Sequence, residues 1–353
     1  MRAHRKARGR RVSSRGSRKK AQGKPMKRFG VLAFALAMGI AGFFLWGYAA
    51  FNGAGPKHGH ETVVVIKSGI GLRGIAKDLG KAGVVSNADL FYVCVRLSGK
   101  THFLKAGEYA IPDAASMADI VDLMASGRSV VHKVTVAEGL TSQMALDLVN
   151  AKSDLSGDAG AVPEEGTLLP ETYLFERGTS REDILKRMRT AQEEFLERQW
   201  PMRDTALPLK TKREALILAS VVEKETALPQ ERRHVAAVFY NRLKTGMKLQ
   251  SDPTIIYGLT KGYPLGRGIR KSEIEQVTPY NTYAIVGLPA APICNPGKDS
   301  IAAVLHPDKS NDLYFVANGS GGHAFAATID EQVKNVAHWR TIEKKKQPSP
   351  AKH

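Results

Sequence analysis

The longest uninterrupted apolar stretch of the chain lies near its N-terminus. Residues 29–51 form a run of 23 positions without one charged side chain. A helix needs ~20 apolar residues to cross the hydrocarbon core of a bilayer, whereas the apolar part of a cleaved signal peptide covers only ~7–15 residues. The length of the run therefore predicts a single N-terminal transmembrane helix. Residues 52–61, rich in Gly, Pro and His, are predicted to be a linker.

A small α+β module is predicted over residues 62–129. It opens with an alternating strand pattern at 63–67, and a second strand is expected at 107–111. Between them lie one amphipathic helix and a further helix at 88–97, and a last helix is expected at 117–124. The apolar residues on one face of the first helix are Leu72, Ile75, Ala76 and Leu79.

The next region, residues 130–212, is predicted to be a connecting α+β segment. A strand is expected at 132–137 and a helix at 142–151. A long charged helix at 181–200 begins after Ser180, a good helix-capping residue. Its charges indicate a solvent-exposed face, so we assign this helix a structural role.

The most informative pattern is a helix that is apolar on every face, at residues 215–222, which predicts deep burial. Two carboxylates, Glu223 and Glu225, follow it. Glu225 falls on the more apolar stripe, above three residues that lie three, four and seven positions before it: Val222, Val221 and Leu218. Apolar surroundings disfavour the charged form of a carboxyl group and raise its pKa, which suits a general acid.

The residues leave one other interpretation of these carboxylates open and disfavour a second. Glu225 can instead be an ordinary helix-end residue in an ion pair, because structural ion pairs also involve carboxylates. Its candidate partners are Lys224, Arg232 and Arg233. A catalytic pair of Glu223 with Glu225 is disfavoured, since residues two apart point to different faces of a helix.

Further turn and capping signals follow the carboxylates. A helix at 231–244 should end at Gly246, where a left-handed cap suits glycine. The sequence Ser-Asp-Pro at 251–253 is typical of a helix start, so capping by Asp252 competes with a catalytic role. Residues 318–322 are predicted to form the turn of a β-hairpin.

The charge of the chain is concentrated at its two ends. The formal net charge is +18, but residues 2–28 contain 13 Lys and Arg and no acid, and residues 52–342 are close to neutral. This distribution excludes a uniformly basic nucleic-acid-binding protein. We expect basic, disordered tails at 1–28 and 343–353, with the first in the cytoplasm and the rest of the chain outside, because loops on the cytoplasmic side are the positive ones. The two cysteines, Cys94 and Cys294, are expected to be unpaired.

Seven ordered sequence blocks, which together cover most of residues 214–328, resemble the YceG-like endolytic murein transglycosylases (MltG family). The blocks are ASVVEKET, VFYNRL, GMKLQSDPTIIYGL, TPYNTY, GLPAAPICNPG, AAVLHP and LYFVANGSGGHAF. The module at 62–129 resembles a LysM domain, which binds N-acetylated glycans, through its SGxxLxxIAxxLG pattern. The resemblance implies an α+β catalytic domain at 213–342, with its catalytic Glu near the end of the buried helix.

The resemblance also implies a function, a location and partners. The function is that of a lyase that cleaves peptidoglycan between N-acetylmuramic acid and N-acetylglucosamine within the strand, leaves 1,6-anhydro ends and so terminates glycan elongation. The protein would lie in the bacterial cytoplasmic (inner) membrane, with its catalytic domain outside. Expected partners are glycan strands, peptidoglycan synthases (penicillin-binding proteins) and other envelope-growth proteins.

For the site itself, the resemblance implies Glu225 as catalytic acid, with no cofactor and no metal. Candidate substrate-binding residues inside the matching blocks are Asn241, Gln250, Asp252, Tyr280, Asn281, Tyr283 and His323.

The residues leave one other function open and disfavour a second. A non-catalytic, peptidoglycan-binding membrane anchor that recruits cell-wall synthases would share the same architecture. A metal-dependent hydrolase is disfavoured, because the ten histidines form no HExxH pattern.

Overall fold

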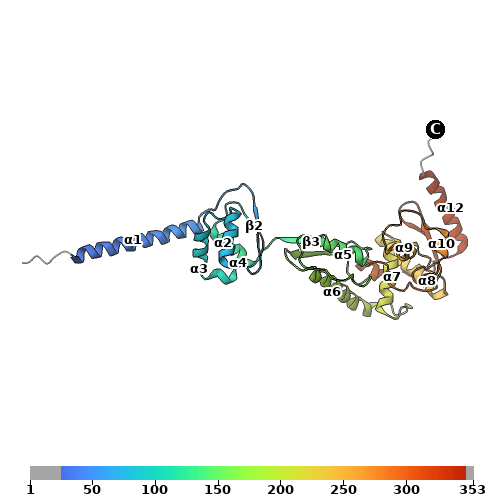
Figure 1. The fold of residues 1–353 in the computed structure, drawn as a ribbon. Helices are drawn as coiled ribbons and strands as arrows, with labels where there is room; N and C mark the ends of the chain where they lie inside the picture. Colours follow the sequence, from blue (N-terminus) through green and yellow to red (C-terminus); the bar gives the residue numbers. More distant parts are fainter. Residues whose placement is uncertain (1–24, 347–353) are drawn as a thin grey trace, which may run out of the picture. The chain divides into compact units, whose positions relative to one another are not determined.

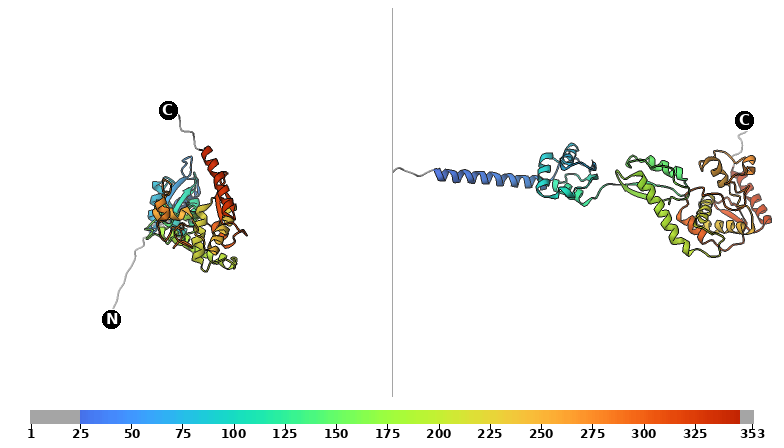
Figure 2. Two further views of the ribbon diagram at one scale, coloured as in Figure 1. Left: turned by 90° about the vertical axis from the view of Figure 1, so that its right-hand side faces the viewer. Right: turned by 60° about the horizontal axis from the view of Figure 1, so that its bottom comes forward.

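The chain divides into two compact units, with the boundary after Arg128 (Figures 1 and 2). The structure is a computed structural model that describes residues 25–346. Both units mix helices with short two-stranded antiparallel sheets. This agrees with the expected α+β class.

The first unit contains α1 to α4, β1, β2 and one 3-10 helix. Their bounds are α1 Pro25–Asn52, β1 Thr62–Ile66, α2 Leu72–Lys81, α3 Ala88–Leu97, η1 Lys100–Phe103, β2 Gly107–Ile111 and α4 Met117–Ser126. The two strands pair in antiparallel register, with Val64 opposite Tyr109. The four apolar residues predicted for the first helix all lie in the core. A reciprocal Ser116–Asp119 capping box starts α4, and Gly127 ends it with a φ of 72°.

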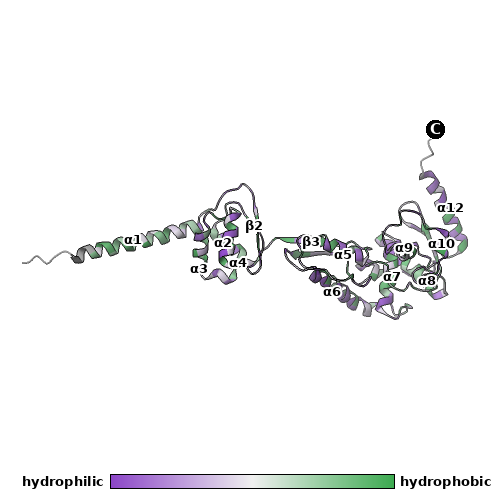
Figure 3. Ribbon diagram, viewed as in Figure 1, coloured by the Kyte–Doolittle hydropathy of each residue, from purple (hydrophilic) through white to green (hydrophobic). Residues whose placement is uncertain are grey.

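Helix α1 is the one helix among residues 25–346 that is long and apolar enough to cross a membrane, over Phe29–Asn52 (Figure 3). The segment after it is attached to the first unit. The Gly55 N–H donates to Ala114 O at 3.0 Å, and Asp113 Oδ1 accepts from the backbone N–H of His58 at 2.6 Å. A side chain at Gly55 would place its Cβ 2.1 Å from Ala115 O. Most residues of the predicted linker are exposed, but hydrogen bonds at Gly55 and His58 attach it to the unit, and glycine permits the close approach at residue 55.

Within residues 25–346, the second unit contains eight α-helices, four strands and two further 3-10 helices. Their bounds are β3 Val131–Thr135, α5 Ser142–Asn150, β4 Thr172–Glu176, α6 Arg181–Gln199, η2 Trp200–Met202, α7 Lys212–Glu225, η3 Pro229–Glu231, α8 Arg232–Thr245, α9 Asp252–Thr260, α10 Lys271–Glu275, α11 Lys298–Leu305, β5 Tyr314–Ala317, β6 His323–Ala326 and α12 Ile329–Lys346.

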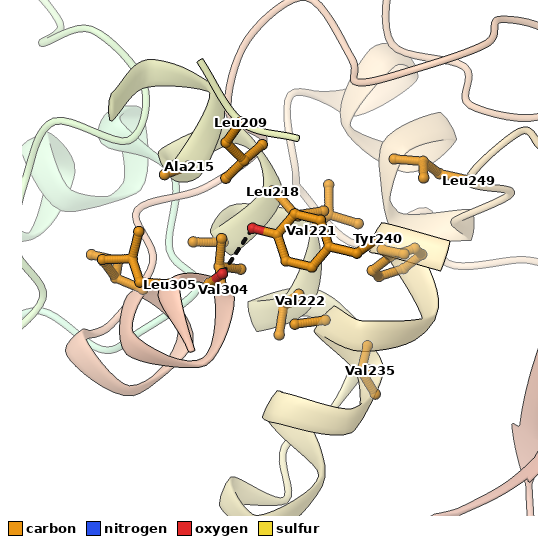
Figure 4. Close-up of a cluster of buried hydrophobic side chains, with 14 of the residues drawn as sticks. Leu209, Ala215, Leu218, Val221, Val222, Val235, Tyr240, Leu249, Val304 and Leu305 are labelled. Atoms are coloured by element: carbon orange, nitrogen blue, oxygen red, sulfur yellow. Dashed lines mark hydrogen bonds between the residues drawn. The ribbon is translucent and has the colours of Figure 1, made fainter. Parts of the chain in front are cut away.

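Two apolar cores support the second unit. The smaller core lies between the β3–β4 pair and helices α5 and α6. The larger core is built around α7, α8 and α11, with the inward faces of all three helices buried (Figure 4). Within it, the Tyr240 hydroxyl donates to Val304 O at 2.7 Å. Val304 lies in the last turn of α11, so Tyr240 satisfies a carbonyl that the helix cannot pair internally.

Three sequence expectations can be compared with these elements. The hairpin is confirmed: β5 and β6 pair in antiparallel register around 318–322. Helix α12 continues to Lys346, so the expected tail at 343–353 begins with helical residues, and 347–353 lie outside the described residues, as do 1–24 of the basic N-terminal tail. Cys94 and Cys294 are both free thiols, as expected.

We predict that Tyr240→Phe destabilises the second unit by about 1–2 kcal/mol, because the buried Val304 carbonyl loses its partner. The measurement is the free energy of unfolding in denaturant. Tyr263→Phe is the matched control: its hydroxyl bonds to Asp147 at an exposed position, so we expect a change below about 0.5 kcal/mol. Equal effects of the two substitutions would contradict the capping role of Tyr240.

Candidate active site

Glu225 is the last residue of α7, a helix whose inward face lies in the larger core of the second unit. A capping box between Thr211 and Glu214 starts α7. Leu218, Val221 and Val222, the stripe below Glu225, have no exposed surface. The chain becomes extended at Thr226, three residues before Pro229. The helix therefore ends directly after Glu225 and not at the proline.

The surroundings of Glu225 raise its pKa to about 7. Burial is the largest cause, and the negative charge of Asp252 acts in the same direction. The Ser251 hydroxyl and the charges of His323 and Arg242 oppose the rise by favouring the carboxylate. Glu225 therefore exists as a mixture of acid and carboxylate near neutral pH, the condition in which one group can donate and then accept a proton.

Ser251 is the nearest hydroxyl that acts on Glu225. Its backbone N–H donates to Thr282 Oγ1 at 3.0 Å, and Gln250 N–H donates to Thr282 O at 3.1 Å. The Ser251 side chain is buried, and its Oγ makes no hydrogen bond of good geometry within residues 25–346. The Ser251 hydroxyl nonetheless lowers the pKa of Glu225. It therefore lies near the carboxyl group and makes no strong hydrogen bond to another described residue.

Gln250 has a strained backbone, with a φ of 52° that non-glycine residues rarely adopt. Its side chain is exposed. Strained residues are found most often where a site requires a particular side-chain direction. The paired backbone bonds to Thr282 hold this conformation in place.

Asp252 is the first residue of α9, and Ser251 occupies the capping position without a capping hydrogen bond. The Asp252 carboxylate accepts a hydrogen bond from the Tyr283 hydroxyl at 2.7 Å instead. Burial and this bond raise the pKa of Tyr283, so the phenol stays protonated and remains a donor. The interpretation of Asp252 as a helix cap is therefore wrong, and its charge faces the Glu225 environment.

His323 reaches the site from the hairpin. Its Nδ1 lies 2.7 Å from Glu231 Oε2, and its backbone N–H donates to Glu231 Oε1 at 2.9 Å. Although burial opposes the change, these bonds lower the pKa of Glu231 and keep it charged. The edge of the imidazole meets Phe315 at a centroid distance of 5.3 Å. The ring is thus fixed from two sides.

Arg242 supplies a fixed positive charge from α8. Its Nε donates to Leu313 O at 2.6 Å and its Nη1 to Leu249 O at 2.5 Å. The guanidinium also lies 5.7 Å from the centre of the Tyr314 ring. Because the group is buried and its donors bind carbonyls, its charge acts on Glu225 without a direct ion pair.

The open alternative, an ordinary ion pair for Glu225, is not found among residues 25–346. Lys224 Nζ donates to Gly139 O, and Arg233 pairs with Asp308. Arg232 is shared among Glu138, Glu223 and Asp299 at 3.1–3.3 Å.

Glu223 is engaged in a different network from Glu225. In addition to Arg232, its Oε2 accepts the N–H of Gly297 at 2.9 Å. The two carboxylates at the end of α7 thus face different partners, in agreement with their expected separation on the helix.

The remaining predicted residues support loops. Asn241 Nδ2 donates to Ser310 O and Asp312 O at 2.8 and 3.0 Å. The buried Asn281 amide bonds three carbonyls of the segment around α10, and its Oδ1 accepts from Tyr283 N–H. The Tyr280 ring packs on Tyr257 with centroids 4.9 Å apart.

Three residues that act on this site were not predicted from the sequence. Ser251 and Arg242 lie inside the conspicuous blocks LQSDPT and VFYNRL, so their position in those blocks was an available signal. Glu231, in a charged run, carried no signal, because its link to His323 spans 92 positions.

Comparisons with known proteins identify the family of the chain. The sequence profile of the YceG-like family matches residues 64–338. The chain belongs to the YceG-like family. It is 31% identical over 329 residues to the endolytic murein transglycosylase of Bacillus subtilis (strain 168), covering 84% of this chain and 89% of that protein.

Two more YceG-like relatives extend the comparison. An endolytic murein transglycosylase of Streptococcus pneumoniae (serotype 2, strain D39) is 29% identical over 325 residues, and the match covers 78% of this chain and 58% of the relative. A putative YceG-like protein of Listeria monocytogenes, known from a crystal structure, is 30% identical, with a TM-score of 0.48 and coverage of 78% of this chain and 99% of that chain.

The raised pKa of Glu225 predicts a pH-dependent stability. A folded pKa of about 7 exceeds the ordinary value of 4.5, so the folded state holds its proton more tightly, and stability is lost as pH rises from about 4.5 through about 7. Measured by denaturant unfolding, the full chain should lose about 2–3 kcal/mol relative to Glu225→Gln over this range. If the free energies of unfolding of the two proteins changed equally with pH, the prediction would be wrong, because Glu225 would then have its ordinary pKa.

Proposed function

We propose that the protein is an endolytic murein transglycosylase that cleaves peptidoglycan strands internally between N-acetylmuramic acid and N-acetylglucosamine. The observation that carries the proposal is a single carboxyl group, Glu225, whose pKa of about 7 results mainly from burial at the end of α7. The names of the B. subtilis and S. pneumoniae relatives supply the substrate class.

The chemistry needs one carboxyl group in two successive states. Protonated Glu225 donates its proton to the glycosidic oxygen, and the bond from that oxygen to C1 of the muramic acid breaks. The C6 hydroxyl of the same sugar attacks C1 and releases its proton to the Glu225 carboxylate. The products are a 1,6-anhydro end and a free hydroxyl on the departing strand, and Glu225 regains its starting form. Because the nucleophile is already part of the substrate, no positioned water and no second catalytic carboxylate are required.

The positive charge that develops at C1 needs negative or polar neighbours. We assign this electrostatic role to Asp252, held by Tyr283, with the sugar's own N-acetyl oxygen as a further contributor. Gln250 and His323 are proposed to contact the glycan, Gln250 because its exposed side chain is presented by a strained backbone. Asn241, Tyr280 and Asn281 are proposed to hold the loops that present these residues.

The location and the module belong to the same proposal. Helix α1 is proposed to anchor the protein in the cytoplasmic membrane with its basic N-terminus inside and the chain that follows α1 outside. The first unit has the strand–helix–helix–strand order that supports a LysM-like, glycan-binding role. Peptidoglycan synthases and other envelope-growth proteins are the proposed partners, and termination of glycan elongation is the proposed biological outcome.

The direct test is product analysis after incubation with purified peptidoglycan. We expect Glu225→Gln to lower the release of anhydro-ended fragments at least ~1,000-fold, since the proton donor is lost. Glu223→Gln, the same substitution two residues earlier on the helix, should retain activity within ~10-fold at a temperature where the variant is folded. Activity retained in Glu225→Gln would favour the alternative, a non-catalytic wall-binding anchor that recruits synthases.

A second test uses the pH dependence of kcat/KM. Activity should decline above about pH 7, where Glu225 loses its proton. Asp252→Asn removes a charge that raises this pKa, so the decline should move to lower pH. Ser251→Ala removes a hydroxyl that lowers it, so the decline should move to higher pH. Shifts in the same direction for both variants would contradict the assignment of the limb to Glu225.

A further inference from the structure

The last turns of α1 pack against the rest of the first unit. Helix α1 contacts both α3 and α4, and Figure 1 shows α3 beside the end of α1. A Cβ at Gly47 would lie 4.0 Å from Leu90 Cδ1 of α3. Phe51, one residue before the end of α1, packs against the core of the unit. The anchor and the unit therefore meet without an intervening spacer.

This contact gives α3 a depth relative to a bilayer. Helices rise 1.5 Å per residue, so Gly47 lies about 8 Å before the end of the apolar span at Asn52. A hydrocarbon core that begins at Phe29 and takes up ~20 residues ends near Tyr48. With α1 spanning the bilayer as proposed, Leu90, at the level of Gly47, would lie at the boundary between hydrocarbon and headgroups.

Exposed apolar residues lie on α3 after Leu90 and on η1, which contacts α3. Val93 and Leu97 follow at helical spacing and are 45% and 73% exposed, and Phe103 on η1 is 63% exposed. Exposed basic residues, Arg96 and Lys105, lie next to these residues in the sequence. Apolar side chains flanked by basic ones are typical of helices that lie in the plane of a membrane interface.

We propose that the apolar stripe defined by Leu90, Val93, Leu97 and Phe103 rests in the outer interface of the bilayer that α1 spans. The occupant of the exposed face is lipid, because the face is continuous with the contact between Leu90 and the membrane span. Seating α3 this way fixes the first unit on the membrane surface. The inference rests on the proposed anchoring role of α1.

The test is electron paramagnetic resonance of single nitroxide labels on the full chain in lipid vesicles. In a background with Cys94→Ser and Cys294→Ala, labels are placed at Leu97→Cys and Phe103→Cys. The matched control is Val65→Cys, an exposed apolar residue of the same unit on the β1–β2 sheet. A label at Leu45→Cys reports on insertion of α1 itself.

We expect the ratio of collisions with oxygen to collisions with a water-soluble nickel complex to be several-fold higher at 97 and 103 than at 65. If the label at 45 is lipid-exposed while 97 and 103 resemble 65, the seating is wrong and the anchor stands. Labels at 97 and 103 shielded from both reagents would indicate a protein partner and overturn the proposal. A water-exposed label at 45 would show that the anchor itself fails, and with it the seating.

Discussion

The partial burial of one carboxyl group, that of Glu225, is the constraint on which the site depends. Helix α7 is buried along the stripe that leads to Glu225, so the carboxyl group can ionise only against a desolvation cost. A fully paired acid would recover that cost and return to its ordinary pKa. Glu225 has no such ion pair among the described residues, because the cationic side chains near it bind other carboxylates or backbone carbonyls.

Glu223 shows the contrasting solution on the same helix. It is equally close to the buried core, but Arg232 and the Gly297 N–H compensate its charge. Breaking such a buried network is costly, because an uncompensated charge remains. The chain thus places two carboxylates with different surroundings two residues apart, and those of Glu225 raise its pKa to about 7.

Segments distant in sequence complete the site. Thr282 holds the strained turn at Gln250 and Ser251 through backbone and side-chain bonds, and Glu231 holds His323 at the start of β6. Arg242 brings its charge from α8 while it ties together the loops at Leu249 and Leu313. These supports explain how groups from two helices, a turn and a hairpin keep a fixed electrostatic balance around Glu225.

Local patterns in the sequence were enough to predict much of this arrangement. The apolar run before Glu225, the glycine at the end of α8 and the turn between β5 and β6 are all properties of neighbouring residues. Other features depend on contacts between distant segments: the pairing of His323 with Glu231, the bond between Asp252 and Tyr283, and the hydrogen bonds of Gly55 and His58. The role of Ser251 could not be predicted for a further reason. It follows from burial of the hydroxyl and from the lack of another hydrogen-bond partner among the described residues, and no local sequence pattern shows either.

Carbon-13 NMR of the side-chain carboxyl groups, with Glu225→Gln used to assign the missing signal, measures the central quantity directly. The account predicts that the Glu225 carboxyl carbon titrates with a pKa of about 7. A midpoint near the ordinary value of 4.5 would contradict it, because Glu225 would then be fully ionised at neutral pH and unable to act as the acid.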